Sequence, residues 1–474
     1  MKCTLPILAL TLCVASCALP HTQTDTAALP FQPAWKIPAG FKLAQPSDQA
    51  LPEAWWTVYG DADLNALMAQ VSKGNQTLAQ ADAQYRQAVG LLASAQSTLY
   101  PGLTATLGAT RSQQPILTSG GALASPPASN LFQLSGAFSW EPDLWGALHA
   151  NIASSEATAR AGLDNRGAIL LSLQAQLASS YFQLRAADAI LQLLRDTVAA
   201  DQRNLDLTNA RHAGGLAART DVTQASSQLE SARASLADAA ISRDTLEHAL
   251  AVLTGHAAQE FRIPARPWAP PKWPALPIAL PSTLLERRPD IANAERLVAA
   301  QAYKLQATES AFYPVVTLNA TIGFESKQAN KWLALPKSFW SVGPQLTQYL
   351  LDGGNHTALR DQTLATLDQA TAAYREVVLE SFQSVQDAMS SVAALDEEIQ
   401  RAQAAAEAAA ETLALVTEQY KSGTVGYLNV LSAQTTLLSA QLTVLNVNSR
   451  QGVAHVNLVK ALGGGWKDSP QTGG

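Results

Sequence analysis

The chain has 474 residues, of which 15% are charged and 47% hydrophobic, and its formal net charge is −6. This balance excludes a surface of clustered Lys and Arg for nucleic acid, so we expect no nucleic-acid partner. The length is large for one ordinary domain and suggests an internal duplication.

The first residues have the features of a bacterial export signal. Lys2 supplies a positive end, an apolar run extends from Leu5 to Val14, and small residues precede Cys17. We predict a signal peptide at residues 1–16, lipid on the Cys17 thiol, and a lipidated tether at residues 17–50. Ala18 resembles the sorting pattern of outer-membrane lipoproteins. The alternative is an ordinary signal peptide with a chance cysteine.

A duplication occupies most of the chain. Adding 208 to a landmark reaches its image, so that Gly146 maps to Gly354 and Gly215 to Gly423. Both copies carry apolar residues at intervals of seven: Leu163, Leu170, Leu177, Leu184, Leu191, Val198 and Leu205, then Val378, Val385, Val392, Ile399, Ala406 and Leu413. A preserved seven-residue register predicts long helices in a coiled-coil-like wall.

Each copy is predicted to contain a strand pair followed by a helical hairpin. The first repeat covers residues 51–255 and the second covers 286–466, with a Pro-rich connector at 256–285 and a tail at 467–474. The predicted strands lie at about 102–112, 130–141, 314–326 and 338–349, and the long helices at 146–211, 218–254, 354–421 and 427–462. Another helix is expected from Asp61 to Leu99.

The strands alternate between apolar and small polar residues, as in Leu134-Ser135 and Thr317-Leu318. Their length of about 10 residues is typical of outer-membrane barrel strands, although soluble hairpins on a core are the alternative. Four strands cannot close a barrel, because the smallest membrane barrels have about eight. If the strands span a membrane, several chains must therefore share one barrel.

Three segments resemble the TolC family of outer-membrane efflux factors, and more narrowly its NodT/OprM-type lipoproteins. They are Trp55-Trp56 with Tyr59-Gly60-Asp61, the string Leu-Glu-Arg-Arg-Pro-Asp-Ile at 285–291, and the segment 458–466. The resemblance covers roughly residues 50–466. It implies a mainly α fold with a membrane β-barrel portion, in a homotrimer with a shared 12-stranded barrel and a 12-helix cylinder. It also implies contact with outer-membrane lipid, a periplasmic membrane-fusion adaptor and an inner-membrane pump of the resistance–nodulation–division class.

The resemblance places the periplasmic end of the channel at the two helix turns. Residues implied in adaptor docking are Arg211, Gly214, Gly215, Leu216, Lys421, Gly423, Thr424 and Val425. The periplasmic gate maps to Leu428 and Ser432, with Asp221, Arg219 and Tyr420 next in line. Many relatives carry an acidic residue where this chain has Ser432.

The sequence contains no recognisable catalytic constellation. Its seven histidines are scattered without a His-x-x-x-His pair, so no zinc site is predicted. The charged segment from Glu286 to Asp290 is interpreted as a helix start. We therefore predict a passive efflux conduit for small molecules, with no enzyme activity and no cofactor beyond lipid on Cys17. The alternatives are a type I protein-secretion duct and a non-conducting structural lipoprotein that spans the periplasm.

Overall fold

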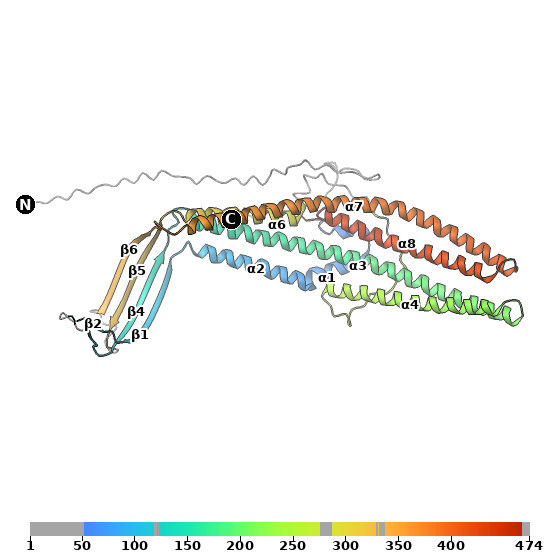
Figure 1. Ribbon diagram of the computed structural model, residues 1–474, viewed down its shortest axis with the longest axis horizontal. Helices are drawn as coiled ribbons and strands as arrows, with labels where there is room; N and C mark the ends of the chain where they lie inside the picture. Colours follow the sequence, from blue (N-terminus) through green and yellow to red (C-terminus); the bar gives the residue numbers. More distant parts are fainter. Residues whose placement is uncertain are drawn as a thin grey trace, which may run out of the picture.

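The computed structural model describes residues 52–117, 121, 123–274, 287–328, 330 and 337–466. The molecule is elongated, with one sheet at one end and long helices that extend away from it (Figure 1). Cys17, the predicted signal peptide and the tether lie outside the described residues, as do residues 275–286 of the connector and the tail.

The sheet contains two strands from each half of the chain. It comprises β1 (Gly102–Ser112), β4 (Ser129–Trp140), β5 (Val315–Ser326) and β6 (Ser338–Thr347), antiparallel in the order β1-β4-β5-β6. Strands β2 (Ile116–Leu117) and β3 (Leu123–Ala124) form a small separate hairpin between β1 and β4. The outer edges of β1 and β6 have no strand partner among the described residues.

The strand register gathers the apolar side chains on one face of the sheet. Leu134 lies opposite Leu107 on one side and Phe324 on the other, and Ile322 lies opposite Trp340. Leu107, Ile322 and Trp340 are all exposed in the single chain. Because side chains alternate along a strand, the opposite face carries most of the Ser, Thr and Gly residues, together with Phe339, whose ring lies against Gly323. The sheet thus has one apolar face that no described part of the chain covers.

The sheet continues into two helical hairpins of matching length. Helices α3 (Ala147–Ala213) and α7 (Asn355–Lys421) each have 67 residues, and α4 (Arg219–Thr254) and α8 (Tyr427–Ala461) return beside them. A 67-residue helix is ~100 Å long at ~1.5 Å per residue. The middle of the predicted heptad ladder is buried, including Leu177, Leu184, Val378 and Val385. Among the described residues, no helix combines the length and apolarity needed to cross a lipid bilayer.

The single helix expected from Asp61 to Leu99 is wrong. The structure has α1 (Ala62–Gly74) and α2 (Gln76–Ser97), separated at Asn75, which is extended. The Asn75 side chain accepts a hydrogen bond from Leu78 N at 3.0 Å and donates one to Leu253 O at 2.9 Å. Since Leu253 lies in the last turn of α4, the break lets α2 begin where α4 ends.

The second repeat has the same junction. Helix α6 (Pro289–Ser310) begins where α8 ends, and Arg288 Nη1 donates to Ala461 O and to Ser384 Oγ, both at 3.0 Å. Pro289 occupies the first turn of α6 together with Asp290, so the interpretation of this charged segment as a helix start is confirmed. The guanidinium also places a positive charge at the negative end of the α8 dipole.

We predict that Asn75→Ala destabilises the protein by about 1–3 kcal/mol, because a helix cap and a buried interhelical hydrogen bond are lost together. Asn75→Asp should keep the acceptor for Leu78 N but put a buried carboxylate oxygen against Leu253 O, so it should destabilise the protein at least as much as Asn75→Ala. Thermal unfolding of the detergent-solubilised protein, followed by circular dichroism, would measure this. Exposed Gln80→Ala in the same helix is the matched control, and an equal loss there would refute the role of Asn75.

Candidate functional site

The two helix turns at the far end from the sheet have the same hydrogen-bond pattern. Leu216 N donates to Arg211 O at 2.8 Å, and Thr424 N donates to Gln419 O at 2.9 Å. Each turn has a glycine in the left-handed region, Gly215 at φ +71° and Gly423 at φ +79°. This six-to-one bond with a left-handed residue defines a Schellman motif. A Cβ would meet nothing within 4 Å at either glycine, so backbone conformation, not space, requires glycine there.

A small aromatic core joins the two turns. The Arg211 guanidinium lies 4.6 Å from the centre of the Tyr420 ring, and its Nη1 donates to Tyr420 O at 3.4 Å. Tyr420 in turn packs edge-on against Tyr427 at 5.7 Å, and both tyrosines are buried with Ala225 and Val430. Arg211 and Tyr420 are therefore partners that fasten one turn to the other.

The remaining predicted gate residues differ in exposure. Leu428, near the start of α8, is 62% exposed, and Ser432 one turn later is also exposed. Arg219 is exposed at the start of α4, whereas the Asp221 carboxylate accepts a hydrogen bond from Ala218 N at 3.3 Å. Of the predicted docking residues, Gly214, Leu216, Lys421 and Thr424 are exposed, and Val425 is half-buried.

A buried carboxyl group near the turns was missed by the sequence reasoning. Asp201 in α3 is 3% exposed, and its Oδ2 has no hydrogen-bond partner. Burial raises the pKa of Asp201, and a hydrogen bond from Gln228 in α4 opposes that shift. Burial, followed by the negative charge of Asp201, raises the pKa of Tyr427 to about 12. No heptad or motif signal marks Asp201, because it occupies an ordinary position of a long helix.

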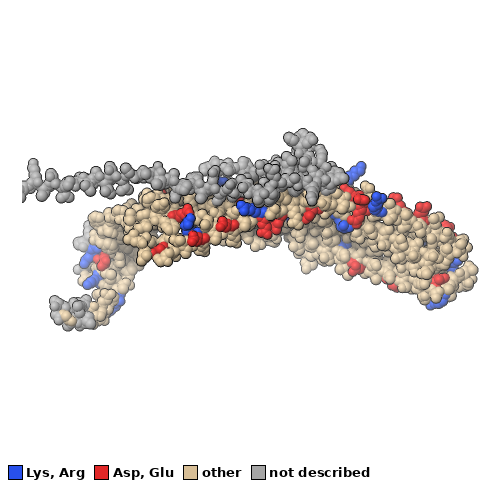
Figure 2. Space-filling view, turned by 45° about the horizontal axis from the view of Figure 1, so that its top comes forward, with Lys and Arg blue, Asp and Glu red and all other residues tan. Residues whose placement is uncertain are grey.

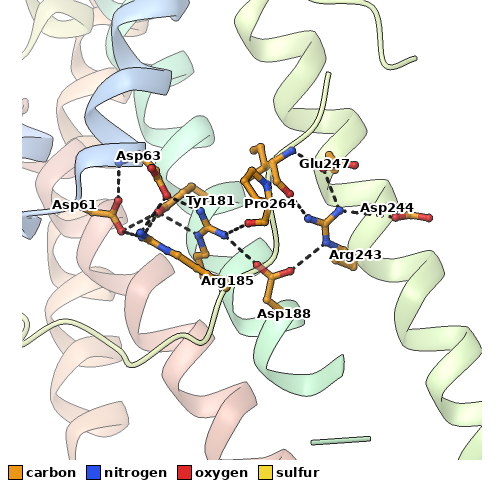
Figure 3. Close-up of polar contacts among 11 residues, drawn as sticks. Asp61, Asp63, Tyr181, Arg185, Asp188, Arg243, Asp244, Glu247 and Pro264 are labelled. Carbon is orange, nitrogen blue, oxygen red and sulfur yellow. Dashed lines mark hydrogen bonds and ion pairs between the residues drawn. The ribbon is translucent and has the colours of Figure 1, made fainter. Parts of the chain in front are cut away.

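A second polar cluster lies midway along the helices (Figure 3). Arg185 of α3 is fully buried and binds Asp188 at 3.0 Å, Asp63 at 2.8 Å and Pro264 O at 3.0 Å. Arg243 of α4 continues the network, binding Asp188 at 3.1 Å. Because every buried charge here has an opposite charge within hydrogen-bond distance, the network can be buried without leaving an isolated ion.

This network fastens the connector between the repeats to the helices. The connector donates Ile263 N to Glu247 Oε1 at 2.7 Å, and Pro264 O accepts from Arg185. Arg266, also in the connector, binds Asp61 at 2.6 Å. We call residues 261–274 the strap. The strap forms neither helix nor strand, and its residues Phe261 and Ile263 are buried in the main core.

The end of the strap is fastened by aromatic rings. Trp273 stacks on His455 of α8, with ring centres 5.0 Å apart at 18°, and Phe182 and Tyr59 contact it edge-on. A Cβ on Gly452 would lie 3.0 Å from Trp273, so glycine lets the indole lie against α8. His455 is 6% exposed and its Nδ1 has no hydrogen-bond partner.

None of these clusters has the arrangement of an active site. The described part of the chain contains no group of three or more His, Cys, Asp or Glu residues placed to hold a metal ion. The charged side chains visible in Figure 2 mix both signs along the helices. The features that remain are a one-sided apolar sheet, long helices in register with it, and paired turns at the far end.

Comparison with known proteins identifies the class. The family model described as "Outer membrane efflux protein" matches residues 67–256 and 280–464. The pyoverdine export outer membrane protein OpmQ of Pseudomonas aeruginosa is 31% identical over 430 residues, covering 90% of each chain. Outer membrane protein OprJ of the same species is 28% identical over 98% of this chain and 95% of its own. The solved outer-membrane channel OprN has 26% identity and a TM-score of 0.82, covering 92% of this chain and 100% of that one.

The chain belongs to the outer membrane efflux protein family. The predicted resemblance, the mainly helical fold with a small antiparallel sheet, and the outer-membrane location are thereby confirmed. The protein is a channel component of an efflux system and a conduit, not an enzyme.

The His455 environment predicts a specific pH dependence of stability. Burial lowers the pKa of His455 to about 4, against an opposing effect of Asp396, so the folded state holds the ring neutral. The unfolded chain binds a proton below its ordinary pKa of 6.5. The contribution of the neutral His455 ring to the free energy of unfolding is therefore fully present above pH 6.5. It is lost as the pH drops toward 4, which lowers the free energy of unfolding by up to about 3 kcal/mol.

We expect His455→Phe to keep the Trp273 stack and remove this part of the pH dependence. The measurement is the free energy of unfolding at several pH values between 7 and 4. Exposed His248→Phe in α4 is the control and should retain the wild-type slope. Parallel curves for wild type and His455→Phe would contradict the assignment.

Proposed function

We propose that three copies of this chain join into one conduit that crosses the outer membrane and the periplasm. In this assembly the conduit is the outer component of a tripartite pump that exports small molecules. The single observation that supports it is a sheet whose outer strands have no partner in the described part of the chain and which has one apolar face, continuous with helices ~100 Å long.

The free edges of the sheet support the sharing of strands. In hydrocarbon, each unpaired backbone group costs several kcal/mol, so β1 and β6 need partners. A head-to-tail ring in which β6 pairs with β1 of the next copy satisfies both edges with one kind of contact. Three copies give 12 strands, which lies within the range of closed membrane sheets. The apolar face then meets lipid, and the Ser, Thr and Gly face lines the pore.

The helical hairpins supply the periplasmic half of the conduit. Their turns, with Gly215 and Gly423, would dock a membrane-fusion adaptor that connects to an inner-membrane pump. Relatives named for the efflux of toluene and the export of pyoverdine support small-molecule cargo without choosing one compound. Lipid on Cys17 would anchor the chain to the membrane.

We propose Leu428 as the narrowest ring of the closed tip. It is an exposed leucine at the start of α8, next to the turn, and Ser432 follows on the same helix face. Three leucines around one axis would form an apolar constriction that resists water and ions. Arg211 and Tyr420 hold the two turns together beside it, while Asp221 caps α4 close by.

The oligomeric state and conduction test this proposal together. Detergent-extracted protein should have the mass of a trimer and should form ion-conducting pores in planar bilayers. A monodisperse monomer that conducts would disprove the shared sheet. A trimer that never conducts would favour a structural lipoprotein.

The facing of the sheet gives a matched pair of substitutions. Leu134→Asp should impair trimer assembly, because it puts a carboxylate against lipid at a cost of roughly 2 kcal/mol near the midplane. Ser135→Asp, on the next residue, should be tolerated in the pore. Heat-resistant trimer on a semi-native gel is the readout, and equal yields of both variants would mean that the faces are misassigned.

The tip gives a second prediction. Leu428→Ala should raise single-channel conductance severalfold, and Ser432→Asp should increase cation preference by adding a ring of charge. Leu415→Ala, an exposed leucine on α7, is the control and should conduct like wild type. An unchanged conductance in Leu428→Ala would place the constriction elsewhere.

The anchor is tested separately. Cys17→Ser should abolish metabolic labelling with a radioactive fatty acid, because it removes the thiol that would carry the lipid. The variant should still assemble, since the sheet buries far more apolar surface in lipid than acyl chains do. Labelling that persists in Cys17→Ser would show that the lipid is attached at another residue.

A further inference from the structure

A collar of exposed apolar side chains surrounds the junction between the sheet and the helices. The chain passes between a helix and a strand of the main sheet at four places, and each place has an aromatic residue near the end of the strand. These residues are Tyr100 before β1, Trp145 after β4, Tyr313 before β5 and Tyr349 after β6. All four are exposed, and Leu350 and Leu351 are each 93% exposed. Aromatic rings with a polar edge favour the boundary between hydrocarbon and water. The collar therefore lies at the lipid head groups if the sheet crosses the membrane.

A hollow of about 430 Å³ opens within this collar between α6 and α7. Its lining comprises Glu309, Phe312, Tyr313, Thr357 and Arg360. Arg360 Nε lies 3.3 Å from Glu309 Oε1, and both side chains remain about one-third or more exposed. The hollow thus presents an accessible ion pair, a hydroxyl group and two aromatic rings at the level of the head groups.

The charges around the hollow discriminate between lipid classes. Arg360 also has Asp361 Oδ1 at 3.8 Å from its Nη1, so one cation faces two carboxylates. A ligand with only a negative charge would be repelled by this surplus. A zwitterion placed antiparallel to the ion pair would put its anion on the guanidinium and its cation near Glu309. Phe312 can add a cation–π contact to that cation, whereas one face of Tyr313 is stacked on Trp145 with ring centres 5.1 Å apart.

We propose that this hollow binds the head group of a zwitterionic phospholipid, phosphatidylethanolamine. The phosphate would accept from Arg360 and the Thr357 hydroxyl, and the ammonium would donate to Glu309. The acyl chains would continue over the collar toward the apolar face of the sheet. This inference rests on the proposed function, in which the sheet crosses the membrane at this level.

Native mass spectrometry of the delipidated full-length protein tests the site. Phosphatidylethanolamine and phosphatidylglycerol with identical acyl chains are added separately at equal concentration. We expect more bound phosphatidylethanolamine per protomer, with at least a fivefold loss in Arg360→Gln and in Glu309→Gln. Arg401→Gln is the matched control, because Arg401 also pairs with a glutamate on α7 but lies far from the sheet. Soluble phosphoethanolamine should not compete, since it lacks acyl chains.

Equal binding of the two lipids, or an equal loss in Arg401→Gln, would overturn the proposal. So would full competition by phosphoethanolamine, which would indicate a site for the free ion. Thr357→Val serves as a smaller change if Arg360→Gln fails to assemble, with an expected loss of about threefold. Conductance in bilayers tests the proposed conduit separately from the lipid site, because Arg360→Gln should lose lipid binding but conduct normally. A wild-type protein that binds lipid but does not conduct would refute the proposed function alone.

Discussion

The wall of this protein depends on helices that end against the start of other helices. Helices α4 and α8 each stop halfway, and α2 and α6 continue in their place toward the sheet. At each junction a side chain of the incoming helix start binds a last-turn carbonyl, Asn75 to Leu253 O and Arg288 to Ala461 O. Helix ends leave backbone groups without partners, so a buried end needs such contacts. Only α3 and α7 are continuous from the sheet to the turns. The two junctions allow α2 and α6 to extend the lines of α4 and α8, so that four helices reach the sheet.

The duplicated plan and its long elements could be predicted from the sequence, because periodicity is a local signal. Alternation indicated the strand faces, and the seven-residue ladder and the glycines located the long helices and their turns. The break at Asn75 could not be predicted, since its cause is the carbonyl of Leu253, 178 residues away. The strap shows the same limit. A Pro-rich segment indicates an extended chain, but not that Trp273 will lie on His455.

The two repeats have diverged where the strap crosses them. Arg185, Arg243 and Glu247 correspond, at the offset of 208, to Ala393, Gln451 and His455. Asp188 corresponds to Asp396, and both still bind the returning helix, through Arg243 at 3.1 Å and Gln451 at 2.8 Å. One half therefore holds the strap with ions and the other with stacked rings. The ionic half costs more to dehydrate and is less tolerant of losing one partner.

The paired Schellman turns have a consequence for symmetry. In a threefold ring, the turns at Gly215 and Gly423 would present six ends with the same backbone hydrogen bonds. The side chains at equivalent places differ, as Leu216 in one turn corresponds to Thr424 in the other. A partner that recognises the main chain would meet a pseudo-sixfold surface, whereas one that recognises side chains would meet a threefold surface. Duplication within one gene thus doubles the number of equivalent contact points without changing the number of subunits.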